Sequence, residues 1–197
     1  MIDKEKCIRC GKCIHSCPFG AIASKTFIVP VIEALKAGKH IYAMEATATE
    51  GQFGVDITMA SWKKAMKEMG FTDFYDVGLG GDMTAAYEAE EWAEAYKEGN
   101  KKVTSCCPAF VNMVRLHYPE LAECVSTTVS PMCAVSRLIK AKDPEAITVF
   151  IGPCVAKKSE VADQKIEGNA DYVLTYSEIR AMMKAKGVEL QLSLIHI

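Results

Sequence analysis

The sequence predicts an α/β fold, in which helices flank a parallel β-sheet, with a small cysteine-rich module at the N-terminus. Short apolar segments alternate along the chain with segments of helical periodicity, and this alternation is typical of parallel sheets. Residues 147–151 form a continuous apolar run, as strands buried on both faces do. Hydrophobic residues make up 50% of the 197 residues, so the chain can form a packed core.

The first half of the chain is expected to contain three helices and two strands. Helices are predicted over residues 28–37, 52–69 and 83–97, each with a glycine close behind that can end it. The strands are predicted over residues 40–46 and 71–77, and the glycine-rich loop over residues 78–81. Within the 52–69 helix, Val55, Trp62 and three methionines recur at helical spacing, which predicts core packing rather than cofactor binding.

The second half is expected to alternate strands and helices in the same way. Strands are predicted over residues 102–105, 147–151 and 172–175. Helices are expected to run from Pro108 to His117, from Pro131 to Lys140, and from a cap at Ser177 to Lys186. Ligands bind beyond the carboxyl ends of parallel strands. Cysteine motifs follow two of the predicted strands, and we therefore expect a second metal site at that edge of the sheet.

The N-terminal module carries a run of four cysteines and a proline, with the spacing C-x2-C-x2-C-x3-C-P. Its members are Cys7, Cys10, Cys13, Cys17 and Pro18. This spacing is that of bacterial [4Fe–4S] clusters. The two-plus-two spacing of zinc sites is absent, and a disulfide knot would need an oxidising compartment.

The fourth cysteine of the run leaves one alternative open. In two-cluster modules the fourth cysteine of a run binds the other cluster. Cys17 therefore serves either this cluster or a second one, and the sequence favours half of a two-cluster module, over residues 1–25. The following α/β domain is expected to begin at Thr26.

Composition excludes several classes of function. The net charge is −2, and positive and negative residues are interspersed along the chain, so the sequence shows no basic patch of the kind that binds nucleic acid. No apolar stretch approaches the roughly 20 residues that span a bilayer. Nine cysteines without a secretory signal predict a reducing, cytoplasmic location, unless a targeting segment lies upstream.

The adjacent Cys106 and Cys107 are expected to have different roles. Neighbouring side chains of an extended chain diverge, so both thiols cannot comfortably bind one tetrahedral ion. One of them can bind metal, while the other, next to an electropositive centre, would have a lowered pKa and could carry protons. The alternative is two small buried hydrophobic residues.

Several blocks together resemble the catalytic domain of iron-only ([FeFe]) hydrogenases, and the likeness covers essentially residues 3 to 191. The blocks are residues 104–108 (TSCCP), 126–131 (STTVSP), 151–160 (IGPCVAKKSE), 81–84 (GDMT), 118–121 (YPEL) and 51–53 (GQF). The resemblance implies the first lobe of that domain and part of the second, preceded by a ferredoxin-type module.

The resemblance also implies a cofactor, the H-cluster: a [4Fe–4S] cubane bridged to a diiron unit with CO, cyanide and dithiolate ligands. By this resemblance Cys107 and Cys154 bind the cubane, and Cys106 passes protons to the dithiolate. Lys157 is implied as the donor to a cyanide ligand, and Glu160 as an acidic residue near the cofactor.

A proton relay through Glu88, Ser126 and Glu91 is likewise implied. Glu88 and Glu91 are three residues apart on a predicted helix and therefore share one face. The alternative is an ordinary solvated acidic face, since Glu90 and Glu94 are close in sequence.

The chain also departs from the family pattern. The family's third cysteine motif should supply two more cubane ligands, and no cysteine follows Cys154. We therefore expect an incomplete fragment, with a domain over residues 26–191 and a sequencing-adapter tail over residues 192–197. Four single positions depart from the family pattern as well. This chain has Gly152 where the family usually has methionine, Thr47 in place of proline, Ala95 in place of arginine and Phe110 in place of tryptophan.

The intact parent is expected to interconvert protons and H2 reversibly, with electrons from ferredoxin or a similar carrier, and the fragment alone is expected to be inactive. One alternative is a non-catalytic, hydrogenase-like iron–sulfur assembly or sensor protein. Another is a bare electron-transfer module, which would explain the first cysteine motif but not the other two.

Overall fold

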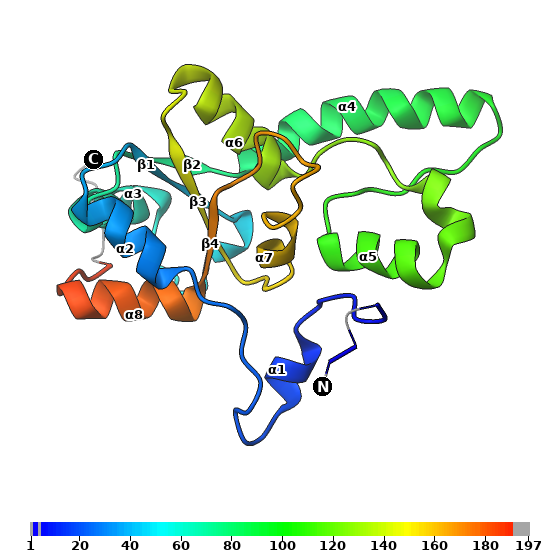
Figure 1. Cartoon of the computed structure of the whole chain (residues 1–197). Helices are drawn as coiled ribbons and strands as arrows, with labels where there is room; N and C mark the ends of the chain where they lie inside the picture. Colours follow the sequence, from blue (N-terminus) through cyan, green and yellow to red (C-terminus); the bar gives the residue numbers. More distant parts are fainter. Residues whose placement is uncertain (1, 4, 191–197) are drawn as a thin grey trace.

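The computed structural model describes residues 2, 3 and 5–190, and its centre is a four-stranded parallel sheet (Figure 1). The strand order is β2-β1-β3-β4. The strands are β1 (Ile41–Glu45), β2 (Asp73–Asp76), β3 (Ile147–Gly152) and β4 (Tyr172–Thr175). All three pairings are parallel, which confirms the predicted fold class. The apolar run in β3 lies centrally, where helices cover both faces of the strand.

One face of the sheet is covered by α2 (Ile28–Lys36), α3 (Met59–Met69) and α8 (Tyr176–Lys186). Trp62 and Met66 are buried there, as the apolar stripe predicted. Val55, by contrast, is 94% exposed, because α3 begins at Met59 rather than at residue 52. The hydroxyl of Thr58 accepts the N–H of Ser61 and caps the helix at that point.

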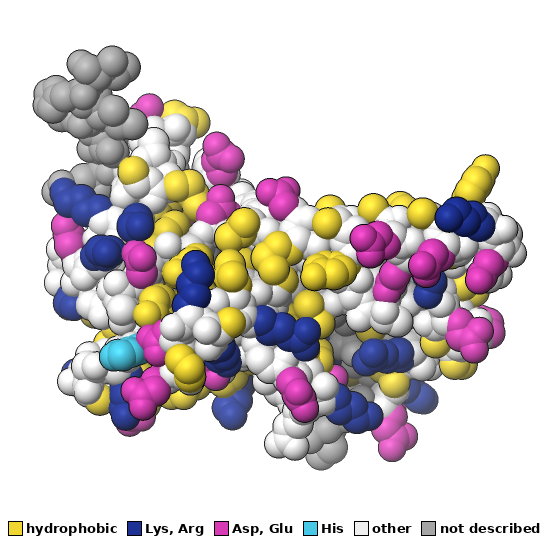
Figure 2. Space-filling model, turned by 90° about the horizontal axis from the view of Figure 1, so that it is seen from above, with side chains coloured by type: hydrophobic (Ala, Val, Ile, Leu, Met, Phe, Trp, Pro, Cys, Tyr) yellow, Lys and Arg dark blue, Asp and Glu magenta, His cyan; other side chains and the backbone are white. Residues whose placement is uncertain are grey.

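The other face is covered by α6 (Pro131–Lys142), and the long helix α4 (Gly78–Lys97) packs on α6. A β-carbon on Gly80 would lie 2.2 Å from the carbonyl oxygen of Pro131, so the two helices cross closely at this glycine. This packing explains why residues 78–81 form the first turn of α4 and not the predicted loop. Seen from above, α4 shows hydrophobic and acidic side chains toward solvent (Figure 2).

The remaining elements surround the ends of this core. They are α1 (Lys12–Ser16), η1 (Thr47–Thr49), α5 (Pro108–His117), η2 (Pro119–Cys124) and α7 (Lys157–Glu160). The predicted strand at 102–105 is wrong: only Val103 pairs, in a single parallel bridge with Val125. The last helix is capped by Thr175, which forms a capping box with Glu178, and not by Ser177.

The N-terminal module is tied to the rest of the chain at both ends. The side-chain amide of Asn112 donates to the carbonyl of Ile8 at 3.3 Å. At the other end, the ammonium of Lys158 donates to the hydroxyl of Ser24 at 3.1 Å and to the carbonyl of Lys25 at 2.9 Å. Among the described residues, no helix is long and apolar enough to cross a membrane.

Candidate functional site

The cysteine run lies against the loop that carries Cys154. Gly11 has a φ of +78°, and a β-carbon there would lie 2.2 Å from the Cγ2 atom of Val155, next to Cys154 in sequence. The position therefore requires a glycine, both for its backbone conformation and for the close approach of the two segments.

The donor chemistry of the run fits an iron–sulfur cluster. All four thiols are free, and none of them is fully buried. The pKa of Cys17 is lowered because backbone N–H groups, those of Ala21 and Phe19 above all, hydrogen-bond to its sulfur. Such bonds favour the thiolate that iron requires. Within residues 2, 3 and 5–190, no three His, Cys, Asp or Glu side chains are grouped so as to hold a single metal ion.

Cys106 and Cys107 are positioned by α4 and not by the sheet. The carboxylate of Glu88 accepts the hydroxyl of Thr104 at 2.8 Å and the N–H of Ser105 at 3.2 Å. Cys107 then precedes the first turn of α5, where Pro108 starts the helix. The expectation that this motif ends a sheet strand is wrong. For Cys154 the expectation is confirmed, since this residue lies two positions beyond the end of β3.

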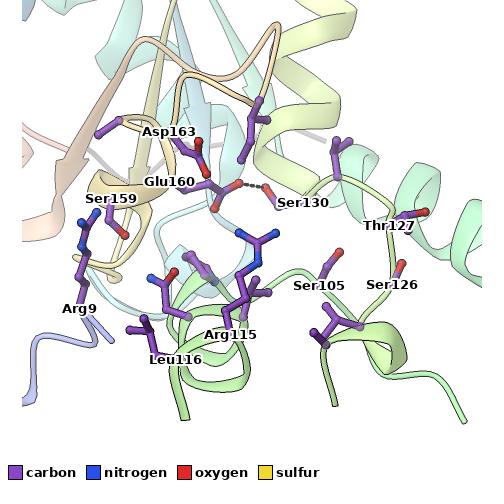
Figure 3. Close-up of a pocket in the computed structure, with 18 of the residues that line it drawn as sticks. Arg9, Ser105, Arg115, Leu116, Ser126, Thr127, Ser130, Ser159, Glu160 and Asp163 are labelled. Atoms are coloured by element: carbon purple, nitrogen blue, oxygen red, sulfur yellow. Dashed lines mark hydrogen bonds between the residues drawn. The ribbon is translucent and has the colours of Figure 1, made fainter. Parts of the chain in front are cut away.

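Lys157 and Glu160 form a buried ion pair that reaches Cys106. The ammonium of Lys157 lies 2.6 Å from a carboxylate oxygen of Glu160 and donates to the carbonyl of Cys106 at 3.1 Å. The other carboxylate oxygen of Glu160 accepts the hydroxyl of Ser130 (Figure 3). Lys157 and Glu160 are only 9% and 8% exposed. Three segments that are far apart in sequence thus meet through one ion pair.

A cavity of about 770 Å³ opens beside this cluster (Figure 3). It lies between α5, the segment that leads into α6, and α7, and Arg9 of the cysteine run also lines it. Ser105, Ser126 and Glu160 contribute polar groups to its wall. Cys7 lines the cavity, whereas Cys106, Cys107 and Cys154 do not. The pairing of Cys107 with Cys154 as ligands of one cubane therefore stays a prediction.

The two relay carboxylates differ from the other acidic residues of α4. Glu88 and Glu91 are half-buried, whereas Glu90 and Glu94 are exposed. Glu91 accepts the N–H of Thr127 at 3.1 Å and its hydroxyl as well. Burial alone would raise the pKa of Glu91, but hydrogen bonds from Thr127 and Ser126 outweigh it and lower the pKa overall. Glu88 and Glu91 thus differ in exposure from Glu90 and Glu94, while their role in a proton relay stays a prediction.

The comparisons with known proteins agree with this geometry. Residues 39–194 match the family model described as iron only hydrogenase large subunit, C-terminal domain. The chain belongs to this family. Residues 1–23 of this hydrogenase-family chain match a 4Fe-4S binding domain, which supports the assignment of the cysteine run.

Curated relatives include two hydrogenases and one assembly factor. Iron hydrogenase 1 of Clostridium pasteurianum is 31% identical over 85% of this chain and 33% of its own length. The periplasmic [Fe] hydrogenase large subunit of Nitratidesulfovibrio vulgaris is 31% identical over 95% of this chain and 58% of its own length. The cytosolic Fe-S cluster assembly factor NAR1 of Kluyveromyces lactis is 34% identical over 40% of this chain and 17% of its own length. The chain thus spans less than two thirds of each relative.

Sequence reasoning missed several residues of the site in this hydrogenase-family chain. Thr104, Thr127 and Ser130 orient its carboxylates, and all three lie in the motif blocks that carried the resemblance. Outside this site, sequence reasoning also missed the buried Glu45, although a carboxylate that ends an apolar strand is an unusual pattern. The predicted tail over residues 192–197 lies outside the described residues.

Proposed function

We propose that the chain is part of an iron-only hydrogenase that interconverts protons and H2, with electrons from ferredoxin or a similar carrier. The observation that supports this best is the buried pair of Lys157 and Glu160, which is bonded to the backbone of Cys106. Removing Lys157 and Glu160 from water is costly even as a pair, so a site that retains them is consistent with a role for the charge. An anionic cofactor ligand beside Lys157 would give its ammonium such a role.

Two groups would be held by this chain. The H-cluster, when bound, supplies the iron centre at which the H–H bond is made or broken. Cys107 and Cys154 would hold its cubane as two of the four ligands that such a cluster takes. Cys7, Cys10 and Cys13 would hold a [4Fe–4S] cluster, and Cys17 would serve that cluster or a neighbouring one.

Lys157 is suited to bind an anionic ligand in a fixed orientation. Its ammonium has three donors, and the carbonyl of Cys106 and the carboxylate of Glu160 take two of them. The third donor can make a charge-assisted hydrogen bond to a cyanide ligand. The hydroxyl of Ser130 fixes Glu160 in turn, so the lysine is held from both sides.

The proton path would run from the thiol of Cys106 through Glu88 and Ser126 to Glu91. Glu88 hydrogen-bonds to Thr104 and Ser105, directly before this thiol. The lowered pKa of Glu91 keeps its carboxylate ionised at neutral pH, so it can accept a proton.

We also propose that the chain has two domains, over residues 1–25 and 26–191, and that the protein is located in the cytoplasm.

The test uses the full-length parent protein loaded with its cofactor. Glu88→Gln keeps the shape of the side chain but removes its ability to cycle a proton, so H2 evolution should fall by about 10²-fold or more. The infrared bands of CO and cyanide should remain, because no ligand is removed. Glu90→Gln, an exposed neighbour on α4, is the matched control and should retain both. The proposal fails if the wild-type parent shows no such bands, or if Glu88→Gln evolves H2 at the normal rate.

A second candidate function is an iron–sulfur assembly or sensor protein without hydrogen chemistry. The similarity to the NAR1 assembly factor favours it over the 79 matched residues. In that case the parent would contain iron and labile sulfide in cubane amounts, without CO or cyanide bands. Under the first proposal, residues 1–197 alone should not evolve H2, because Cys107 and Cys154 are only two of the four thiolates that a cubane takes.

A further inference from the structure

The segment that carries Cys154 also carries a lysine that binds the N-terminal module. The ammonium of Lys158, on α7, donates to the hydroxyl of Ser24 at 3.1 Å and to the carbonyl of Lys25 at 2.9 Å. The same ammonium lies 2.8 Å from each carboxylate oxygen of Glu178, on α8. Lys158 thus joins three parts of the chain, which are the module, the segment after β3 and the last helix.

The acidic partner, Glu178, is itself held in one orientation. Its carboxylate accepts the N–H of Thr175 at 2.7 Å and the hydroxyl of Thr175 at 2.9 Å, in the capping box that starts α8. The side chains of Lys158 and Glu178 are only 7% and 13% exposed. A buried ion pair is seldom more stabilising than apolar residues of similar volume. What this pair adds is a fixed direction for the lysine, toward the module.

Two adjacent lysines of α7 bind different parts of the molecule. Lys157 donates to the carbonyl of Cys106 in the candidate site, whereas Lys158 donates to the module. Both belong to one helix of four residues, about a single turn. This short helix therefore connects the candidate site with the cysteine-rich module.

The module is bound to the other cysteine motif as well. Helix α5 begins directly after Cys107, and its Asn112 donates to the carbonyl of Ile8 at 3.3 Å. This bond holds the first half of the cysteine run, while Lys158 holds the chain that follows Cys17. Figure 1 shows the module below α5 and α7, apart from the layers of the sheet. Its position relative to both cysteine motifs thus depends on such contacts and not on the central core.

We propose that Lys158 is a positioning residue for electron transfer, which holds the cysteine run at a fixed distance from the segment that carries Cys154. This role rests on the proposed function, in which the run and Cys154 bind two iron–sulfur clusters. Each H2 that forms consumes two protons and two electrons, and reduced ferredoxin supplies the electrons and is oxidised. Electron transfer slows steeply as two clusters move apart. Loosening the module should therefore slow H2 evolution while leaving the chemistry of the site intact.

Two variants of the full-length, cofactor-loaded parent separate positioning from stability. Lys158→Met removes the bonds to the module but leaves the carboxylate of Glu178 buried without its ion pair. Lys158→Met/Glu178→Gln removes this charge too, while the glutamine oxygen can still accept the N–H of Thr175. Lys140→Met is the matched control, because Lys140 also forms an ion pair and donates to a carbonyl, with both partners outside the module.

Two activities report different steps. H2 evolution with reduced ferredoxin requires electron transfer and chemistry, whereas exchange of hydrogen isotopes between H2 and D2O requires no net electrons. In Lys158→Met/Glu178→Gln the ferredoxin-driven rate should fall by about tenfold or more, as a displacement on the order of 1 Å can produce. H2/D2O exchange should stay at the wild-type rate, and Lys140→Met should retain both activities. A double variant with normal H2 evolution, or with an equal loss of H2/D2O exchange, would overturn the proposal.

Amide hydrogen exchange, followed by mass spectrometry, tests the attachment of the module without turnover. The amides of residues 7–25 should exchange faster in the double variant than in the wild type, and those of β1 and β3 should not change. Unchanged amide exchange over residues 7–25 would contradict a role of Lys158 in holding the module.

Folding and function are decided separately. Urea unfolding shows whether each variant is folded, and Ser24→Ala, which removes one bond to the module, replaces the double variant if that variant is not. A wild-type parent without H2/D2O exchange would refute the proposed function. The amide exchange of residues 7–25 decides by itself whether Lys158 holds the module.

Discussion

Glu45 makes the stability of the protein depend on pH. This residue ends the central strand β1, opposite Asp76 of β2, and is 0% exposed. Among the described residues, neither of its carboxylate oxygens has a hydrogen-bond partner of normal geometry. The pKa of Glu45 is raised from 4.5 to about 8. Burial is the largest cause and the charge of Asp76 adds to it, while the nearby hydroxyl of Thr49 acts in the opposite direction. Glu45 is therefore neutral in the folded protein at pH 7.

The magnitude follows from the extra proton that the folded state holds. Between pH 4.5 and about 8 the folded chain binds this proton and the unfolded chain does not. The stabilisation from the bound proton is complete below pH 4.5 and is lost as the pH rises through about 8. The free energy of unfolding should fall by about 1.4 kcal/mol for each pH unit in this window. Between about pH 5.5 and about pH 7.5 the loss from Glu45 is about 2.7 kcal/mol.

Glu45→Gln removes this titration while keeping the shape of the side chain. Urea unfolding, followed by circular dichroism under anaerobic and reducing conditions, gives the free energy of unfolding at each pH. The difference between Glu45→Gln and the wild type should grow in favour of the variant by about 2.7 kcal/mol from about pH 5.5 to about pH 7.5. The exposed Glu50→Gln should run parallel to the wild type. Parallel curves for Glu45→Gln and the wild type would refute the reasoning.

Two further predictions concern the attachment of the cysteine run. Gly11→Ala should destabilise the chain to urea by about 1 kcal/mol or more, because alanine disfavours positive φ and its methyl group meets Val155. Adding Val155→Ala should recover part of that loss, and no recovery would contradict the contact. Lys158→Met should cost about 3 kcal/mol, because it leaves the largely buried carboxylate of Glu178, whose side chain is 13% exposed, without its ion pair. The exposed Lys165→Met is its control in the same assay, and an equal effect would contradict the prediction.

The regular elements could be predicted where local pattern decides them. The apolar run of β3 and the helical periodicity of α6 reflect which residues face the core, and this pattern can be read directly from the local sequence. The start of α4 could not be predicted in this way. Its glycine-rich first turn is helical because Gly80 packs on Pro131, a contact between residues about fifty positions apart. Residues 102–105 did not form the predicted strand, because a segment becomes a strand only where it finds a pairing edge, and here only Val103 pairs.

In the candidate site, too, some contacts follow from local sequence spacing and others depend on the tertiary fold. Lys157 and Glu160 are three residues apart on one short helix, so their pairing follows from sequence spacing. The contacts of Glu88 and Glu91 with Thr104 and Thr127 join separate segments, and only the fold brings them together. The burial of Glu45 is likewise a tertiary property. Residue types and spacing thus indicated the chemistry, while the orientation of each acid required the packing of α4.

Because α4 contacts α6 closely at Gly80, a tilt of α4 about this point would displace the far end of the helix. Glu91 lies eleven residues beyond this pivot, which at the rise of an α-helix is a distance of about 16 Å. A tilt of about five degrees at the pivot would displace Glu91 by about 1.4 Å, enough to separate it from Thr127. Conversely, the hydrogen bonds from Thr104 to Glu88 and from Thr127 to Glu91 restrain the part of α4 that lies beyond Gly80. A ligand, partner or substitution that reorients α6 would thus displace Glu91, in the proposed proton path, without contacting it.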